Sequence, residues 1–261
     1  MYFIDTHSHL YLKQFNKDRE QVVHNAINAG IKNILLPNID RSTTADMKSL
    51  CALFPENCFP MMGLHPCSVK KETLEMELKH VDSELNKDKY IAVGEIGIDL
   101  HWKKSTLDIQ KKAFAYQIEL AKKLDLPIVI HVRNSFNEAI EIVKNMNDSK
   151  LSGVFHCFSG NVEDAQRIIN LDRFYLGIGG VVTFKNSGLA DTIKNIDLQH
   201  IILETDSPYL SPSPFRGDRN ESKYIIEIAK KICDVKNITL EELADITSKN
   251  ANSLFKLDSS K

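Results

Sequence analysis

Cysteine patterns that would indicate a disulfide framework or a cysteine-ligated metal are missing from this sequence. Its five cysteines are odd in number, scattered, and never form a C-x-x-C pair: Cys51, Cys58, Cys67, Cys157 and Cys233. Such a set is typical of reduced thiols in a cytosolic protein and not of a disulfide-stabilised secreted one. The 261 residues, of which 43% are hydrophobic, are instead sufficient for a sizeable buried core.

Long apolar runs and an excess of charge of one sign are also absent. No apolar stretch approaches the roughly 18 residues that a membrane span requires, and the first residues lack the basic and apolar segments of a signal peptide. The net charge of -2 and the pI of about 6.5 exclude an overall basic field of the kind that nonspecific nucleic-acid binders use. We expect a cytoplasmic protein without membrane contact, in which any phosphate contact is local.

Short apolar segments rich in β-branched residues recur along the chain and alternate with amphipathic stretches. The eight strand candidates cover residues 2–5, 33–39, 58–65, 90–98, 127–132, 153–158, 174–180 and 200–206. Helical spacing is clearest in residues 19–30, 107–124, 223–233 and 239–255, and the last of these opens with a capping box of Thr239 and Glu242. Strands that alternate with helices, without an intervening linker, predict a single (β/α)8 barrel (TIM barrel) domain over residues 1–261.

Side chains able to bind a metal gather where the predicted strands end. In MYFIDTHSHL, alternation along a strand directs Asp5, His7 and His9 to one side. Further candidates lie near the ends of the third, fourth, fifth, sixth and eighth strands: His65, Glu95, His131, His156 and Asp206. Because barrels of this type build their active site at the C-terminal rim, we expect these groups to meet at one mouth.

From the residues alone, two explanations of this cluster are open. One is a set of hydrogen-bonded polar side chains, the ordinary role of a single histidine on a strand. The other is a metal site, which is favoured because one cation compensates several buried polar groups. Nitrogen and carboxylate ligands without sulfur suit Mg, Mn or Zn, and the number of ligands exceeds a tetrahedral site. Two ions that share a carboxylate fit this number better, with His7 and His9 on one ion.

Seven motifs then follow one another through nearly the whole chain: FIDTHSHL, GLHP, GEIGID, PIVIHVR, FHCFSG, LETDSPYL and PFRGDRNE. In this order they resemble the TatD family of metal-dependent hydrolases, within the amidohydrolase-like barrels. The resemblance implies a (β/α)8 fold and hydrolysis of phosphodiester bonds, typically as a deoxyribonuclease that works from the 3′ end.

The resemblance also implies roles for individual residues. Six of them would be metal ligands: His7, His9, Glu95, His131, His156 and Asp206. The first two histidines bind one ion, Glu95 bridges both ions, and the other two histidines hold the second ion. Asp206 lies beside the first ion, where it orients the water and accepts its proton. His65, from GLHP, contacts the substrate or the leaving group.

Two further carboxylates follow from strand alternation. Glu204 shares a face with Asp206, so we expect it to point inward and to orient a histidine ligand. Asp5 either does the same beside His7 or makes an ordinary hydrogen bond at the end of its strand.

Substrate contacts are expected from Arg133, Arg216 and Trp102. Arg216 lies in a proline-rich loop after the eighth strand, where barrels often bind phosphate, and guanidinium groups bind phosphate through two hydrogen bonds. Trp102 is expected to stack on a base, although packing against a neighbouring loop explains it equally well. For Arg216, the alternative to phosphate binding is a surface salt bridge.

Two positions depart from the pattern of the family. RGDRNES carries Asp218 and Ser222 where relatives commonly read RGKRNEP, and His101 stands where they usually have an aromatic residue. None of these residues is a predicted metal ligand, so the departures concern substrate preference.

The main prediction is therefore a monomeric hydrolase with two divalent ions per chain, acting on DNA, single-stranded or at 3′ ends. A metal-dependent deacylase acting on D-aminoacyl-tRNA shares the same ligands and stays open as an alternative. A non-catalytic nucleic-acid-binding protein is opposed by the near-neutral charge and by the complete ligand set.

Overall fold

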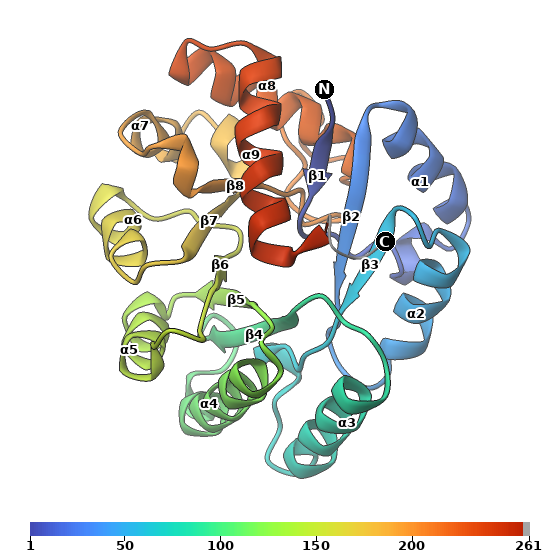
Figure 1. Ribbon diagram of the computed structural model, residues 1–261, viewed down its shortest axis with the longest axis vertical. Coiled ribbons are helices and arrows are strands. Elements are labelled where there is room, and N and C mark those ends of the chain that lie inside the picture. Colours follow the sequence, from blue (N-terminus) through green and yellow to red (C-terminus); the bar gives the residue numbers. More distant parts are fainter. Residues whose placement is uncertain (258–261) are drawn as a thin grey trace.

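Eight parallel strands form the centre of the computed structural model, which describes residues 1–257 (Figure 1). They are β1 (Phe3–Asp5), β2 (Ile31–Pro37), β3 (Cys58–Met61), β4 (Val93–Asp99), β5 (Ile128–Arg133), β6 (Gly153–Phe155), β7 (Phe174–Ile178) and β8 (Ile201–Leu203). Strands β1 to β3 pair in one sheet and β4 to β8 in another, each strand beside its neighbour in sequence. Single bridges between Ser8 and Ser207 and between Met62 and Val93 join the two sheets, which closes the barrel.

Helices surround this barrel, as the alternating pattern predicts (Figure 1). Those described are α1 (Arg19–Asn28), α2 (Thr44–Leu53), α3 (Leu74–Lys87), α4 (Leu107–Leu124), α5 (Phe136–Met146), α6 (Val162–Ile169), α7 (Leu189–Lys194), α8 (Ile225–Lys236) and α9 (Leu240–Phe255). The predicted (β/α)8 fold is confirmed, and both hydrogen bonds of the capping box between Thr239 and Glu242 are present at the start of α9.

Several strands are shorter than predicted, because the residues that approach the site leave the regular ladder. The sixth strand, expected through Phe158, ends at Phe155, and the eighth, expected through Asp206, ends at Leu203. Cys157 and Asp206 have φ angles of 48° and 57°, which no strand residue adopts. The chain therefore turns at the positions where the polar side chains must converge.

The N-terminal end of the barrel is closed by apolar packing. Six strand residues and Ala92, which directly precedes β4, form an apolar cluster at this end: Ile4, Leu35, Met61, Ala92, Val129, Val154 and Ile202. Leu254 and Phe255 of α9 pack against them, and Figure 1 shows α9 crossing the ring of strands. Burying a side chain of this size contributes about 1.5–3 kcal/mol. This apolar layer therefore stabilises the N-terminal end of the barrel, opposite the polar C-terminal end.

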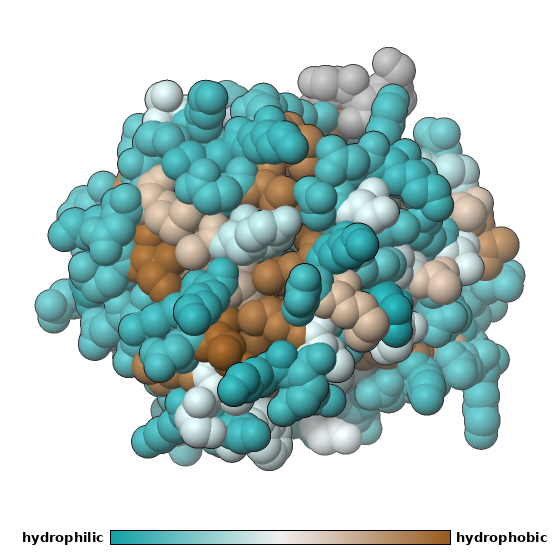
Figure 2. Space-filling model, turned by 90° about the horizontal axis from the view of Figure 1, so that it is seen from below, coloured by the Kyte–Doolittle hydropathy of each residue, from teal (hydrophilic) through white to brown (hydrophobic). Residues whose placement is uncertain are grey.

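The outer surface of the helices is largely polar. The face in Figure 2, over α3 and α4, is mostly hydrophilic, with apolar side chains between the polar ones. The inner sides of these two helices bury residues such as Val81, Leu85 and Phe114. Among residues 1–257, none of the helices combines the length and the apolar composition that would let it cross a membrane.

Candidate metal centre

The Glu95 carboxylate, which is 2% exposed on β4, lies at the centre of a cluster of polar groups at the C-terminal end of the barrel. Its Oε2 atom is 3.2 Å from Nε2 of His7 and 3.5 Å from Nε2 of His9. Oδ1 of Asp206 is 3.7 Å and 3.6 Å from the same two nitrogens. We refer to His7, His9 and Asp206 as the first half of the centre.

The other oxygen of Glu95 faces a second group of histidines. Oε1 is 2.7 Å from Nδ1 of His131, 2.7 Å from Nε2 of His156 and 3.3 Å from Nε2 of His65. These three histidines, the second half of the centre, come from β5, the segment after β6 and the segment after β3. One carboxylate thus presents one oxygen to each half.

Backbone hydrogen bonds between the extensions of β1 and β8 position the first half. The N–H of Asp206 donates to the carbonyl of His7 at 2.8 Å, and the N–H of His9 donates to the carbonyl of Ser207 at 2.7 Å. The two histidines and the aspartate are therefore held in register, although 197 residues separate His9 from Asp206 in sequence.

The donor set fits divalent metal ions. Three groups of ligand atoms lie within 4.8 Å of one another: His7–His9–Glu95, His7–His156–Asp206 and His65–Glu95–His131. Nε2 of His7 is only 3.2 Å from Nε2 of His9. Two neutral imidazole nitrogens that face each other at this distance repel unless a proton or a cation lies between them. Imidazole and carboxylate ligands without sulfur suit Zn, Mn and related ions.

Hydrogen bonds on the far side of the rings determine which nitrogen carries the proton in His9 and His131. The Tyr11 hydroxyl donates to the carbonyl of Pro37, so it accepts from Nδ1 of His9, at 2.9 Å. Nε2 of His131 donates to Oδ2 of Asp99 at 2.9 Å. In the neutral form, each ring therefore turns an unprotonated nitrogen toward Glu95, as a metal ligand must.

Asp99 and Tyr11 were not predicted from the sequence. Asp99 could have been found, since Glu95, Gly97 and Asp99 share one face of β4 by alternation. Gly97 lies so close to β5 that a Cβ atom there would be 2.1 Å from the carbonyl oxygen of His131. The signal for Tyr11 is weaker, because it depends on how the chain turns after His9.

His65 has the opposite hydrogen-bond pattern. The backbone N–H of Cys67 donates to its Nδ1 atom at 3.0 Å, so a neutral His65 carries its proton on Nε2, which faces Oε1 of Glu95. His65 is therefore suited to donate a hydrogen bond at the site, whereas His131, beside it, is suited to bind a metal.

The pKa values of the histidines differ between the halves. Burial lowers the pKa of His7 well below its usual value, and the neighbouring His156 adds to this effect. Burial also opposes protonation of His131 and His156, but nearby carboxylates outweigh it and raise both pKa values. For His131 these are Asp99 and Glu95.

The two central carboxylates shift in opposite directions. Burial opposes ionisation of Glu95, but the charges of neighbouring histidines, His156 first and then His65, outweigh it and hold the pKa of Glu95 well below its usual value. Burial raises the pKa of Asp206 to about 6, and the charge of Glu95 contributes to the rise. Asp206 can therefore take up a proton close to neutral pH, whereas Glu95 stays ionised.

Glu204, which directly follows the last residue of β8, points inward. It is fully buried, its Oε1 atom accepts a hydrogen bond from the N–H of Cys157, and the same atom is 3.6 Å from Nδ1 of His156. Gly177 leaves the space for this carboxylate, since a Cβ atom there would be 2.3 Å from Oε2 of Glu204.

Asp5 makes the hydrogen bonds of a strand end. It accepts from the N–H and the hydroxyl of Thr205, at 2.9 Å and 2.7 Å, and from the N–H of His7 at 3.4 Å. These contacts join β1 to the segment after β8. Asp5 therefore positions the backbone of His7, and among residues 1–257 its hydrogen bonds do not reach the imidazole ring of His7.

Of the predicted substrate contacts, His65 lies in the cluster, whereas Trp102, Arg133 and Arg216 lie outside it. Trp102 is 73% exposed after β4, and the Arg133 guanidinium lies 5.6 Å from the centre of its indole ring. Arg216, in the long loop after β8, lies 3.6 Å from the centre of the Phe184 ring. Within residues 1–257 none of these three side chains makes a hydrogen bond to the metal-ligand candidates, so their roles stay predictions.

A (β/α)8 barrel with a histidine and carboxylate cluster at its C-terminal mouth defines a class of metal-dependent hydrolases. A family model described as TatD related DNase matches residues 4–256. The chain therefore belongs to the TatD family, as its motifs predict, and it is a metal-dependent hydrolase.

Individual relatives agree with this assignment. A Bacillus subtilis protein named as an uncharacterized metal-dependent hydrolase, YabD, is 37% identical over 255 residues, which cover 97% of this chain and 99% of the relative. The Escherichia coli metal-dependent hydrolase YcfH is 28% identical over 265 residues, with 100% and 98% covered. The crystal structure of YjjV, a TatD homologue from Escherichia coli, superimposes with a TM-score of 0.91 at 28% identity, with 97% and 98% covered.

Proposed function

We propose that this chain is a phosphodiesterase with two divalent ions that removes nucleotides from the 3′ ends of DNA, preferentially single strands. The observation that carries this proposal is the Glu95 carboxylate, whose Oε2 atom faces His7 and His9 and whose Oε1 atom faces His131 and His156. A carboxylate in this position is suited to bridge a pair of ions. The description of the matching family as TatD related DNase supports DNA as the substrate.

Each half of the centre would hold one ion. In this proposal His7, His9 and Asp206 hold the first ion, and His131 and His156 hold the second. Bound Mg, Mn or Zn ions would neutralise the charge of the phosphate and lower the pKa of the attacking water toward ~7. Since all these ligands come from one chain, the proposal requires only a monomer.

Proton transfer is assigned to two residues on opposite sides of Glu95. Asp206, with a pKa of about 6, accepts the proton of the attacking water at a carboxylate oxygen. His65, whose Nε2 atom carries a proton directed into the site, donates toward the departing oxygen of the sugar. Its pKa is raised, because the charge of Glu95 outweighs the effect of burial, so a protonated His65 is available near neutral pH.

Substrate binding is assigned to the exposed groups around the mouth. Arg133 and Arg216 would contact phosphates, since guanidinium groups bind phosphate oxygens in pairs. Trp102, which is mostly exposed and has Arg133 over its ring, would stack on a base. In this proposal the substrate phosphates are contacted by these few cationic side chains and not by a broad basic surface, which agrees with the net charge of -2.

The test is a time course with a single-stranded DNA oligonucleotide labelled at its 5′ end, in Mg, in Mn and with chelator. We expect a metal-dependent ladder of progressively shorter products. The Asp206→Asn variant should lose the ladder, and Asp108→Asn, a substitution of an exposed aspartate on α4, should keep it. Folded, metal-loaded protein that leaves the oligonucleotide intact would overturn the proposal, and D-aminoacyl-tRNA would be the next substrate to assay.

A further inference from the structure

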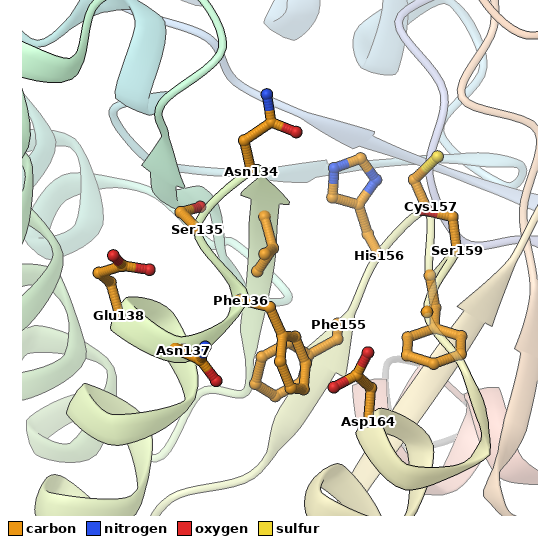
Figure 3. A pocket seen from close by; sticks show the side chains of 13 residues that line it. Asn134, Ser135, Phe136, Asn137, Glu138, Phe155, His156, Cys157, Ser159 and Asp164 are labelled. Atoms are coloured by element: carbon orange, nitrogen blue, oxygen red, sulfur yellow. The ribbon is translucent and has the colours of Figure 1, made fainter.

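A cavity of about 430 Å³ lies directly beside the second half of the metal centre. It is formed by the segments after β5 and β6 and by the first turns of α5 and α6 (Figure 3). His156, a member of the second half, is one of the residues that line it, so the cavity adjoins the metal centre. The proposed reaction leaves this space unused. Its volume is within the roughly 300–1,000 Å³ that is typical of small-molecule sites.

The walls of the cavity are suited to a flat ring. Phe136, Phe155, Phe158 and Val132 supply apolar surface, and the rings of Phe136 and Phe155 are tilted toward each other at 6.3 Å between centroids. Figure 3 shows these two rings between Glu138 on one side and Asp164 on the other. Stacking of a base on an aromatic side chain contributes binding energy that is largely independent of the base.

The polar groups of the cavity accept more hydrogen bonds than they donate. Glu138 and Asp164 contribute carboxylates, and the lining includes no lysine or arginine, so a phosphate group would be repelled. Arg167, which is not a lining residue, donates to Oδ1 of Asn137 at 2.8 Å and lies 4.0 Å from Asp164. Its guanidinium lies 5.0 Å from the centre of the Phe136 ring, on one face of that ring. The Glu138 carboxylate has no hydrogen bond or ion pair with any residue of 1–257. Glu138 is therefore the acceptor that is free for a ligand.

We propose that this cavity binds a nucleobase, with guanine preferred and thymine bound least well. Guanine presents two adjacent donors, N1–H and the exocyclic amino group, which match the two oxygens of one carboxylate. Thymine has one ring N–H donor and no amino group, so it leaves one oxygen of Glu138 without a partner. The inference rests on the proposed phosphodiesterase function for the choice of a nucleotide, and it adds a base preference to that function.

The test compares the binding of deoxynucleoside 5′-monophosphates with that of deoxyribose 5-phosphate, which has the same phosphate but no base. In the presence of Mg, dGMP should bind about tenfold more tightly than dTMP, the lower range for a paired hydrogen-bond contact. Glu138→Gln should abolish this difference and leave the affinity for deoxyribose 5-phosphate unchanged. Glu163→Gln is the matched control, because Glu163 is exposed on the first turn of α6 and does not line the cavity.

A second measurement separates this inference from the proposed function. Free deoxyguanosine, which has no phosphate, is followed by saturation-transfer NMR with wild-type protein and with Glu138→Gln. If dGMP and deoxyribose 5-phosphate bind equally well and deoxyguanosine shows no transfer, the base site is wrong, whereas the phosphodiesterase proposal still stands. If DNA is not cleaved but deoxyguanosine binds and Glu138→Gln abolishes the binding, the base site stands and the phosphodiesterase proposal fails.

Discussion

The two halves of the metal centre face the same carboxylate, but they are assembled differently. In the first half, His7 and His9 lie two residues apart, and hydrogen bonds between the extensions of β1 and β8 hold Asp206 beside them. The second half takes one histidine from each of three segments, after β3, on β5 and after β6. The histidine pair of the first half is therefore local in the sequence, whereas Asp206 and the three histidines of the second half are brought together only when the barrel forms.

The two halves also differ in the groups that contact the side of each histidine ring facing away from Glu95. His9 in the first half is hydrogen-bonded to a neutral tyrosine, Tyr11. In the second half, His131 is hydrogen-bonded to Asp99, and His156 lies 3.6 Å from Glu204. Carboxylates behind an imidazole favour its protonated form, which agrees with the raised pKa values of this half and the lowered pKa of His7. Without metal, the second half thus holds protons that an arriving cation must displace.

The largest effect is expected from a substitution of Glu95, because both halves face its carboxylate. Glu95→Gln abolishes the negative charge that faces both groups of histidines, so both of the proposed ions should be lost or bound weakly. Loss of metal catalysis costs several kcal/mol, or about 10³-fold in rate. Metal content after gel filtration and the rate of hydrolysis of a phosphodiester substrate measure the two effects.

Glu163→Gln serves as the control for Glu95→Gln, because it removes the same charge from an exposed position on α6. It should retain wild-type metal content and activity. A Glu95→Gln protein that still bound two equivalents of metal would show that Glu95 does not bridge the halves.

A smaller effect, confined to the second half, is expected from Asp99→Asn. The substitution removes the charge behind His131 but keeps the shape of the side chain. Partners of this kind typically contribute 10–100-fold to metal affinity. Titration should therefore show one ion bound about 10–100-fold more weakly and the other unchanged, with Asp108→Asn behaving like the wild type. Equal weakening of both ions would contradict the independence of the halves.

The difference between the halves also explains what the sequence predicts well. The H-x-H pair, the (β/α)8 alternation and the ordered motifs are local or periodic signals. The structure gathers the five other predicted metal-ligand candidates in one cluster with Glu95. Tyr11 and the cavity beside His156 could not be predicted in this way. Both depend on turns after strands, where residues such as Cys157 have positive φ angles that the sequence pattern does not reveal.

A pH dependence should separate the halves without any substitution. His131 and His156 have raised pKa values, so in the metal-free protein they hold their protons to a higher pH than ordinary histidines, and acidification from pH 8 to pH 6 opposes metal binding there. The affinity of the second ion should fall by up to about tenfold per pH unit for each proton released. In the first half the lowered pKa keeps His7 neutral, but Asp206, whose pKa is raised to about 6, takes up a proton as the pH approaches 6. The first ion should therefore weaken only toward the acid end of this range.

Calorimetric titration in buffers of different ionisation enthalpy would count the protons released. The stability of the metal-free protein should change with pH in the opposite direction to metal affinity. Protonated His131 and His156 stabilise the metal-free fold below about pH 6.5, and this contribution is lost as the pH rises through their raised pKa values. Equal pH dependence of both ions would contradict the assignment of protons to the second half.

The smallest effect is expected in the first half, from Tyr11→Phe. The hydroxyl accepts from Nδ1 of His9 and donates to the carbonyl of Pro37, and its loss leaves the ring free to turn. One neutral hydrogen bond contributes about 1 kcal/mol, so the first ion should bind about fivefold more weakly, with the second ion unaffected. Tyr116→Phe, on the exposed side of α4, is the matched control. If Tyr11→Phe weakened the second ion as strongly as Asp99→Asn does, the two halves would have to be treated as one coupled site.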